Sequence, residues 1–121
     1  MPLGSTLRRL VAGAFGAVLA LLATAGQAAV PVERLRVPPG FRIELVTDAV
    51  PNARAMTLGR FADGRGVVYV GSMGAGVVYA VELDQGRARA VHTVATGLAL
   101  PAGVAWRDGR LYVSALSRIV R

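Results

Sequence analysis

A strand unit that occurs twice is the feature that most constrains the fold of this chain. Residues 63–70 read Asp-Gly-Arg-Gly-Val-Val-Tyr-Val, and residues 108–113 read Asp-Gly-Arg-Leu-Tyr-Val. Each Asp-Gly pair predicts a tight turn, because Gly accepts a positive φ and Asp bonds the backbone of its own turn. The β-branched and aromatic residues that follow suit a half-buried strand. The two turns begin 45 residues apart, and several short strands per repeat of this length are typical of a β-propeller blade.

The rest of the chain after residue 30 carries the same kind of pattern, and no helical periodicity is present. Alternating or short apolar runs between turn residues predict strands at 41–46, 55–58, 67–71, 76–83, 88–95, 101–106, 111–115 and 117–120. The expected fold class is therefore all-β, and a β-propeller in particular. This chain would supply one complete blade (53–96) and part of a second (97–121). Because the second unit stops at Arg121, we expect the chain to be the opening piece of a larger protein.

The N-terminal segment is predicted to be a secretory signal peptide covering residues 1–28. Arg8 and Arg9 precede an uncharged, apolar stretch at 10–26, and small residues lie at Gly26 and Ala28 before a cleavage site. A second cleavage option follows Ala25, and an uncleaved membrane anchor is the less favoured alternative, since the run is short for a span. We therefore expect a periplasmic or secreted protein, with an extended leader and first strand at 29–52.

Charge and cysteine content exclude several classes of function. The formal net charge is +7 and all 14 basic residues are arginine, but they are scattered along the chain. Nucleic-acid binding would favour clustered arginine with aromatic platforms, so no nucleic-acid partner is expected, and membrane contact only through the signal segment. The chain has no cysteine, which excludes disulfides, cysteine-bound zinc and thiol catalysis within it.

His92 is the only histidine and the first candidate for acid–base chemistry or metal binding. It lies in a predicted outer strand, and no histidine or carboxylate is its near neighbour in sequence. We therefore expect it to be structural or solvated. No catalytic residue and no metal ligand are assigned in this chain, and its cofactor contacts are left unknown.

The other polar and glycine-rich features have structural explanations. The seven carboxylates show no calcium-loop spacing: Asp63 and Asp108 form the repeated turns, and Glu82 and Asp84 are expected at a solvated strand end. The glycine-rich stretch 71–76 leads into a strand and not a helix, which favours a hairpin connection over a phosphate loop. Packing between blades is expected for four aromatic residues, Tyr69, Tyr79, Trp106 and Tyr112.

An ordered series of short motifs extends over nearly all of residues 36–121. The motifs are VPPGFRIE (37–44), VPNAR (50–54), VYVGS (68–72), GL (97–98), Pro101, GVAWRDG (103–109), LYV (111–113) and SRI (117–119). In this combination and order, the series resembles the N-terminal part of exported sorbosone dehydrogenase and related PQQ-dependent soluble sugar (aldose) dehydrogenases, which are six-bladed propellers.

The resemblance implies an oxidoreductase that oxidises a sugar or aldehyde and passes electrons to PQQ, with Ca²⁺ as a second cofactor and an external electron acceptor as partner. The family's catalytic histidine belongs to a later blade and has no counterpart here, so this chain alone is expected to be inactive. The sequence also departs from the family at Ala99 and Ala102, where members often carry Asn.

Two other functions stay open at this point. One is a lactonase-type propeller, in which a metal held by carboxylate and Asn side chains activates water. The other is a non-enzymatic propeller that binds a partner through its faces, since a fold alone does not fix function.

Overall fold

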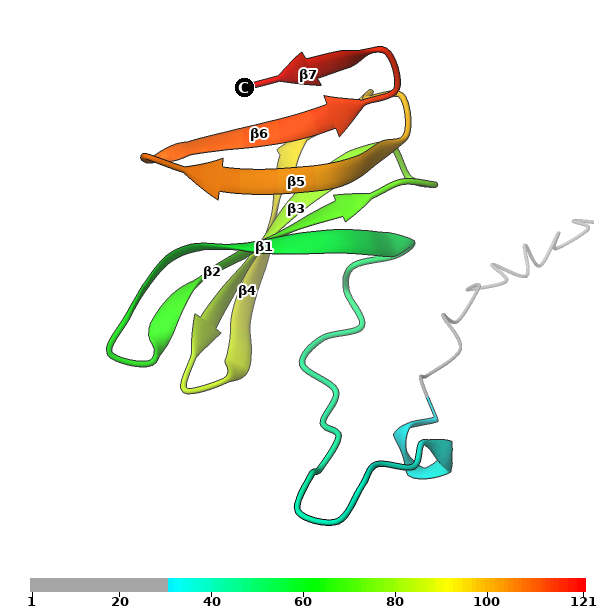
Figure 1. The fold of residues 1–121 in the computed structure, drawn as a ribbon, viewed down its shortest axis with the longest axis vertical. Helices are drawn as coiled ribbons and strands as arrows, with labels where there is room; N and C mark the ends of the chain where they lie inside the picture. Colours follow the sequence, from blue (N-terminus) through cyan, green and yellow to red (C-terminus); the bar gives the residue numbers. More distant parts are fainter. Residues whose placement is uncertain (1–30) are drawn as a thin grey trace, which may run out of the picture.

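The protein is described here by a computed structural model, which places residues 31–121; the predicted signal peptide lies outside the described residues. One three-residue 3-10 turn, η1 (Val32–Arg34), precedes seven strands. The strands are β1 (Ala53–Ala62), β2 (Arg65–Ser72), β3 (Val77–Asp84), β4 (Arg87–Ala95), β5 (Pro101–Arg107), β6 (Arg110–Ala115) and β7 (Arg118–Val120). The all-β prediction is confirmed for this part of the chain (Figure 1).

The first four strands form an antiparallel sheet in the order β1-β2-β3-β4. Its β1–β2 turn is Asp63-Gly64, with φ of 52° and 76°. Two consecutive residues with positive φ define a type I′ turn, whose twist matches that of the two strands of a hairpin. Asp-Gly is one of the pairs that favour this turn. Asp108-Gly109, with φ of 50° and 76°, makes the equivalent turn between β5 and β6. The prediction for both repeated Asp-Gly pairs is therefore confirmed.

The connection between β2 and β3 is a four-residue hairpin loop at 73–76, as predicted for the glycine-rich stretch. Ser72 pairs with Val77 across it, and the Gly76 N–H donates to the Ser72 carbonyl at 3.0 Å. No helix follows this loop in the described residues, so it has none of the geometry of a phosphate loop.

Strand alternation gives the first sheet two distinct faces. Paired residues of antiparallel strands point to the same side, so Val68, Val70 and Val81 share one face. Met56 and Leu58 of β1 pair with Val70 and Val68 and lie on that face too. We call it the leader face, because the segment before β1 covers part of it.

The opposite face of the first sheet packs against the second sheet, and we call it the inter-sheet face. Tyr69, Gly71, Val78 and Ala80 belong to it, and Val78 is fully buried. Gly71 is required at its position, because a Cβ there would lie 2.6 Å from the carbonyl oxygen of Pro101 in the neighbouring sheet.

The second sheet is antiparallel with the order β5-β6-β7. Its contacts with the first sheet come mainly from β5 against β1 and β2, so the two sheets adjoin at their first strands and diverge from there (Figure 1). The buried residues Pro101, Val113 and Ala115 lie on its inner side. The predicted strands from residue 55 onward are all present.

Two predictions about the N-terminal half are wrong. Residues 41–46 form no strand although they alternate, and Phe41 is 72% exposed; no strand edge within residues 31–121 pairs with this segment, and a strand needs a partner for its backbone groups. The strand predicted at 55–58 is too short, because the region 59–66, which no predicted strand covers, is mostly strand. β1 continues to Ala62 and only Asp63-Gly64 turns, because a two-residue hairpin needs no more.

One buried side chain ties the leader to the first sheet. Ser72, at the end of β2, is fully buried, and its Oγ donates a hydrogen bond to the carbonyl oxygen of Pro51. This bond satisfies a carbonyl at the point where the chain enters β1, and a buried acceptor without a partner would be costly.

Candidate functional site

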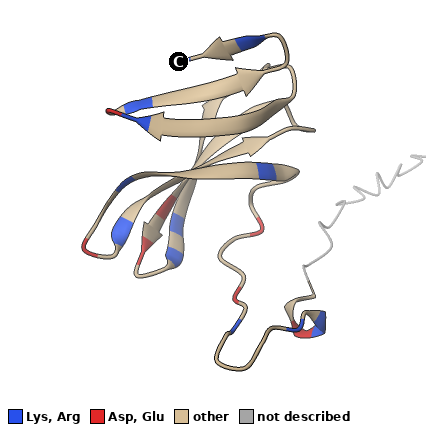
Figure 2. Ribbon diagram, viewed as in Figure 1, with Lys and Arg blue, Asp and Glu red and all other residues tan. Residues whose placement is uncertain are grey.

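One open depression in the described part of the chain has a volume of about 670 Å³. It lies at the end of the first sheet that carries the β1–β2 and β3–β4 turns, where charged residues gather (Figure 2). Its lining includes three arginines, two carboxylates and one aromatic ring: Arg60, Arg65, Arg89, Glu82, Asp84 and Phe61.

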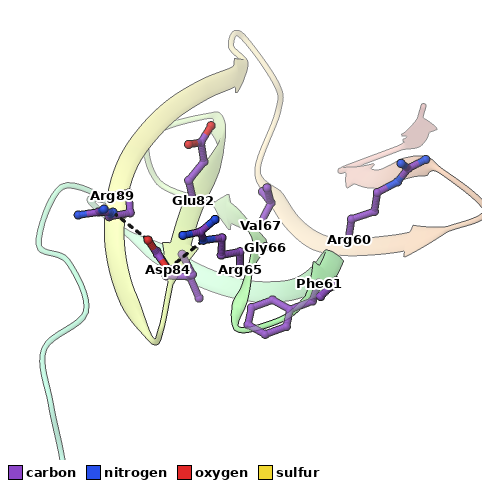
Figure 3. A pocket seen from close by; sticks show the side chains of 10 residues that line it. Arg60, Phe61, Arg65, Gly66, Val67, Glu82, Asp84 and Arg89 are labelled. Atoms are coloured by element: carbon purple, nitrogen blue, oxygen red, sulfur yellow. Dashed lines mark hydrogen bonds and ion pairs between the residues drawn. The ribbon is translucent and has the colours of Figure 1, made fainter.

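Asp84 is the centre of charge in this depression. Its Oδ1 accepts a hydrogen bond from Arg65 Nε at 3.2 Å, and its Oδ2 forms an ion pair with Arg89 Nε at 3.3 Å. The Asp84 side chain is only 20% exposed. Figure 3 shows Asp84 between these two arginines, whereas Arg60 lies apart from them. Asp84 is therefore neutralised by its neighbours, and the sequence-based expectation of a solvated strand end is wrong for this residue.

Glu82 and His92 form a polar pair on the inter-sheet face of β3 and β4. His92 Nε2 lies 2.9 Å from Glu82 Oε1, and both side chains are about half exposed. β4 is the last strand of its sheet, so His92 lies in the outermost strand, as predicted. The solvated position predicted for Glu82 also agrees with its exposure.

A β-bulge brings His92 to the same face as Glu82. Asp84 pairs with Arg87 and Leu83 with Ala88, but Glu82 pairs with Ala90, which leaves Arg89 as an extra residue. His92 then lies opposite Ala80. In an unbulged hairpin it would lie opposite Tyr79 and point to the leader face, since a one-residue shift reverses every side chain.

The chemistry of the Glu82–His92 pair is limited by its surroundings. A carboxylate that orients an imidazole is one part of an acid–base arrangement. Among residues 31–121, however, Glu82 is the only side chain that hydrogen bonds His92, and no hydroxyl approaches the ring in this way. The pair is a surface cross-strand contact, and the structural role of His92 stays a prediction.

A second cavity, of about 370 Å³, lies between the leader and the leader face of the first sheet. Its lining is almost entirely aliphatic: Val46, Thr47, Val50, Ala53, Met56, Val68, Val70, Val81 and Leu83. It offers apolar volume and no charged group, so it has no acid–base chemistry of its own.

Within residues 31–121, no group of three or more His, Asp or Glu side chains lies close enough to hold a metal ion. The Ca²⁺ implied by the resemblance therefore has no ligand set in this part of the chain. Ala99 precedes β5 and Ala102 lies within it, and neither alanine has a side-chain polar group to offer PQQ.

The remaining candidates of the sequence occupy scaffold positions. Tyr69 and Trp106 pack between the two sheets as predicted, whereas Tyr79 lies on the leader face and Tyr112 on the outer side of the second sheet.

The described residues contain no helix that is both long enough and apolar enough to cross a membrane.

Sequence reasoning did not identify the pairing of Asp84 with arginine, although the signal was present. Counting outward from the 73–76 loop pairs Ser72 with Val77 and Arg65 with Asp84. The Glu82–His92 contact had no such signal, because it depends on the bulge at Arg89.

Comparisons with protein-family models, curated proteins and solved structures gave no match to this chain.

Proposed function

We propose that this chain is the N-terminal part of an exported, PQQ-dependent sugar or aldehyde dehydrogenase that resembles the sorbosone dehydrogenase family. The observation that carries the proposal is the ordered motif series over residues 37–119. Its two copies of Tyr-Val, at Tyr69 and Tyr112, occupy the second strand of each of two adjoining antiparallel sheets.

The arrangement of the sheets supports a propeller with these sheets as blades. Each sheet has its strands in sequential order, as in a propeller blade. The first strands, β1 and β5, are neighbours, and the sheets diverge from them, which suits blades that radiate from a central channel. In the full six-bladed protein, β1 and β5 would line that channel.

Within this proposal, residues 31–121 contribute scaffold and not catalytic groups. The single histidine, His92, lies in β4, the strand farthest from β1 in its sheet. It is therefore remote from the proposed channel, and the proton-accepting base and the cofactor contacts are assigned to later blades. The substrate would be a sugar or aldehyde, with a separate electron acceptor.

The test of this function is an activity assay with and without the later blades. The purified chain is mixed with PQQ and Ca²⁺, and dye reduction is followed with several aldoses and aldehydes. We expect no turnover from the chain itself, and PQQ-dependent turnover when the coding sequence downstream of codon 121 is included. Turnover by the 121-residue chain that disappears in His92→Ala would overturn the proposal.

Export is the second part of the proposal, and it rests on Arg8, Arg9 and the apolar stretch before Ala28. Mass spectrometry of the exported protein should find an N-terminus at Ala29 or Gly26. Ala28→Arg should block the Ala29 cleavage, because the site requires a small residue at that position. Recovery of soluble protein that retains Met1 from the cytoplasm would contradict export.

A further inference from the structure

The leader segment 41–46 has the side-chain order of a strand but belongs to neither sheet. Phe41, Ile43 and Leu45 alternate with charged residues, and each of the three is at least 38% exposed. Among residues 31–121, no backbone hydrogen bond joins residues 42–46 to another segment. Both the backbone groups and the apolar side chains of this segment are therefore available to join a sheet edge.

An ion pair within the segment agrees with a strand conformation. Arg42 Nε lies 2.9 Å from Glu44 Oε1, and residues two apart point to the same side of a strand. The charged side chains would then lie on one side of the strand and the apolar side chains on the other, as in a strand that has one face buried.

The segment lies beside β4, the outermost strand of the first sheet. Glu44, Leu45 and Val46 line a depression of about 460 Å³ together with residues 86–88 at the start of β4. Val46 also lines the aliphatic cavity against the leader face. The segment therefore lies in the layer that covers the leader face, at the outer end of the first sheet.

The contact between the two sheets shows which strands of neighbouring layers meet. β5, the first strand of the second sheet, lies mainly against β1, the first strand of the first sheet, so strands of the same rank are neighbours. By the same rule, a strand beside β4, the fourth strand of the first sheet, would be the fourth strand of the sheet on the other side.

We propose that residues 41–46 form the fourth and outermost strand of the last blade, and that the polypeptide after Arg121 supplies the other three strands of that blade. This inference rests on the propeller part of the proposed function. The two ends of the polypeptide would then share one sheet, and the pairing of segment 41–46 with its third strand would close the ring of blades. The same blade would cover the leader face, on which Met56 is 67% and Leu58 61% exposed.

Hydrogen exchange tests the pairing in two forms of the protein, the 121-residue chain and the longer protein that includes the coding sequence downstream of codon 121. An outermost strand pairs through alternate N–H groups. About half of the amides at 42–46 should therefore exchange at least about tenfold more slowly in the longer protein than in the 121-residue chain. β2, an inner strand of the first sheet, is the internal reference and should be protected in both forms.

Proline variants identify which edge of the segment is paired. The N–H groups of neighbouring residues in a strand point to opposite sides, so one of the variants Ile43→Pro and Glu44→Pro removes a donor of the ladder. In the longer protein, that variant should restore fast exchange at the other amides of 42–46, and its neighbour should disturb exchange less. The same variants in the 121-residue chain are the matched control. Neither should change the urea midpoint of that chain, because the segment is unpaired there.

Exchange and activity together distinguish this inference from the proposed enzyme. Slow exchange at 42–46 in a longer protein that shows no PQQ-dependent turnover would support the strand and overturn the enzyme. Turnover with fast exchange at 42–46 would overturn the strand alone. Equal exchange in the two forms would also overturn it, as would a reading frame that ends at codon 121. Protection in the 121-residue chain that increases with its concentration would overturn the last blade as the partner and identify a second copy of the chain instead.

Discussion

The ring of Tyr69 in one sheet lies almost parallel to the ring of Trp106 in the other, at a centroid separation of 5.2 Å. It is the aromatic pair that joins the two sheets within residues 31–121. Because the chain contains one tryptophan, the fluorescence of Trp106 reports directly on the contact between the sheets.

Tyr69→Ala should lower the free energy of unfolding by about 2 kcal/mol, since it removes a half-buried aromatic side chain and its stacking contact with Trp106. The emission of Trp106 should shift to longer wavelength as water reaches the ring. Urea melts followed by tryptophan fluorescence measure both effects. Tyr79→Ala removes an equally large ring from the opposite face of the sheet and should leave the Trp106 emission unchanged. A shift of the emission in both variants would contradict the packing of Tyr69, and not Tyr79, against Trp106.

Gly71→Ala should destabilise the contact between the sheets. The added methyl group would lie 2.6 Å from the Pro101 carbonyl oxygen and 3.0 Å from that of Ala102, and backbone atoms give way only by moving the whole strand. We expect a loss of about 1–3 kcal/mol in unfolding free energy, the usual range for overpacking. Gly74→Ala, whose new Cβ would meet only the Asn52 side chain at 3.2 Å, is the matched control and should be nearly neutral.

Ser72→Ala should loosen the entry of the chain into β1. The substitution leaves the Pro51 carbonyl oxygen without its hydrogen-bond donor in a part-buried position, at a cost of about 1–2 kcal/mol. Hydrogen exchange should become faster around residues 51–55. Ser117→Ala, in an exposed turn, should change neither exchange nor stability, and equal effects of the two variants would contradict the role given to Ser72.

Asp84→Asn should cost up to about 1 kcal/mol at low ionic strength, because it weakens the ion pairs with Arg65 and Arg89, both of which are largely exposed. The difference should shrink in 1 M salt, where screening acts within about 3 Å. Urea melts at the two salt concentrations measure this. Glu44→Gln, which breaks the exposed Arg42–Glu44 pair, should have no measurable effect; a salt-independent loss in Asp84→Asn would point to packing instead.

Most of the sheet architecture could be predicted because short-range chemistry determines it. Asp63-Gly64 and Asp108-Gly109 force two-residue turns, and the alternation beside them sets which residues face each other. The segment 41–46 shows the limit of this reasoning. It has the alternation of a strand. Alternation indicates which side chains would lie on the same face of a strand, but it does not show that a neighbouring strand is present to pair with the segment.

The polar contacts also differ in whether the sequence alone predicts them. Arg65 and Asp84 face each other by simple counting from the 73–76 loop. Glu82 and His92 meet only because Arg89 bulges out of the ladder, and a bulge depends on how the outer strand twists against its neighbour. The spacing of residues within one strand does not predict that twist.

The bulge at Arg89 also makes the length of β4 tolerant of change. Removal of residue 89 would leave Leu83 opposite Ala88, Glu82 opposite Ala90 and Ala80 opposite His92, the same partners as before. β4 has a second extra residue at Val94, whereas a deletion where the ladder is regular would exchange the two faces of the adjoining strand residues. Position 89 is thus a point at which a related gene could lose a codon and keep every cross-strand neighbour, while Asp84 would lose one of its two arginines.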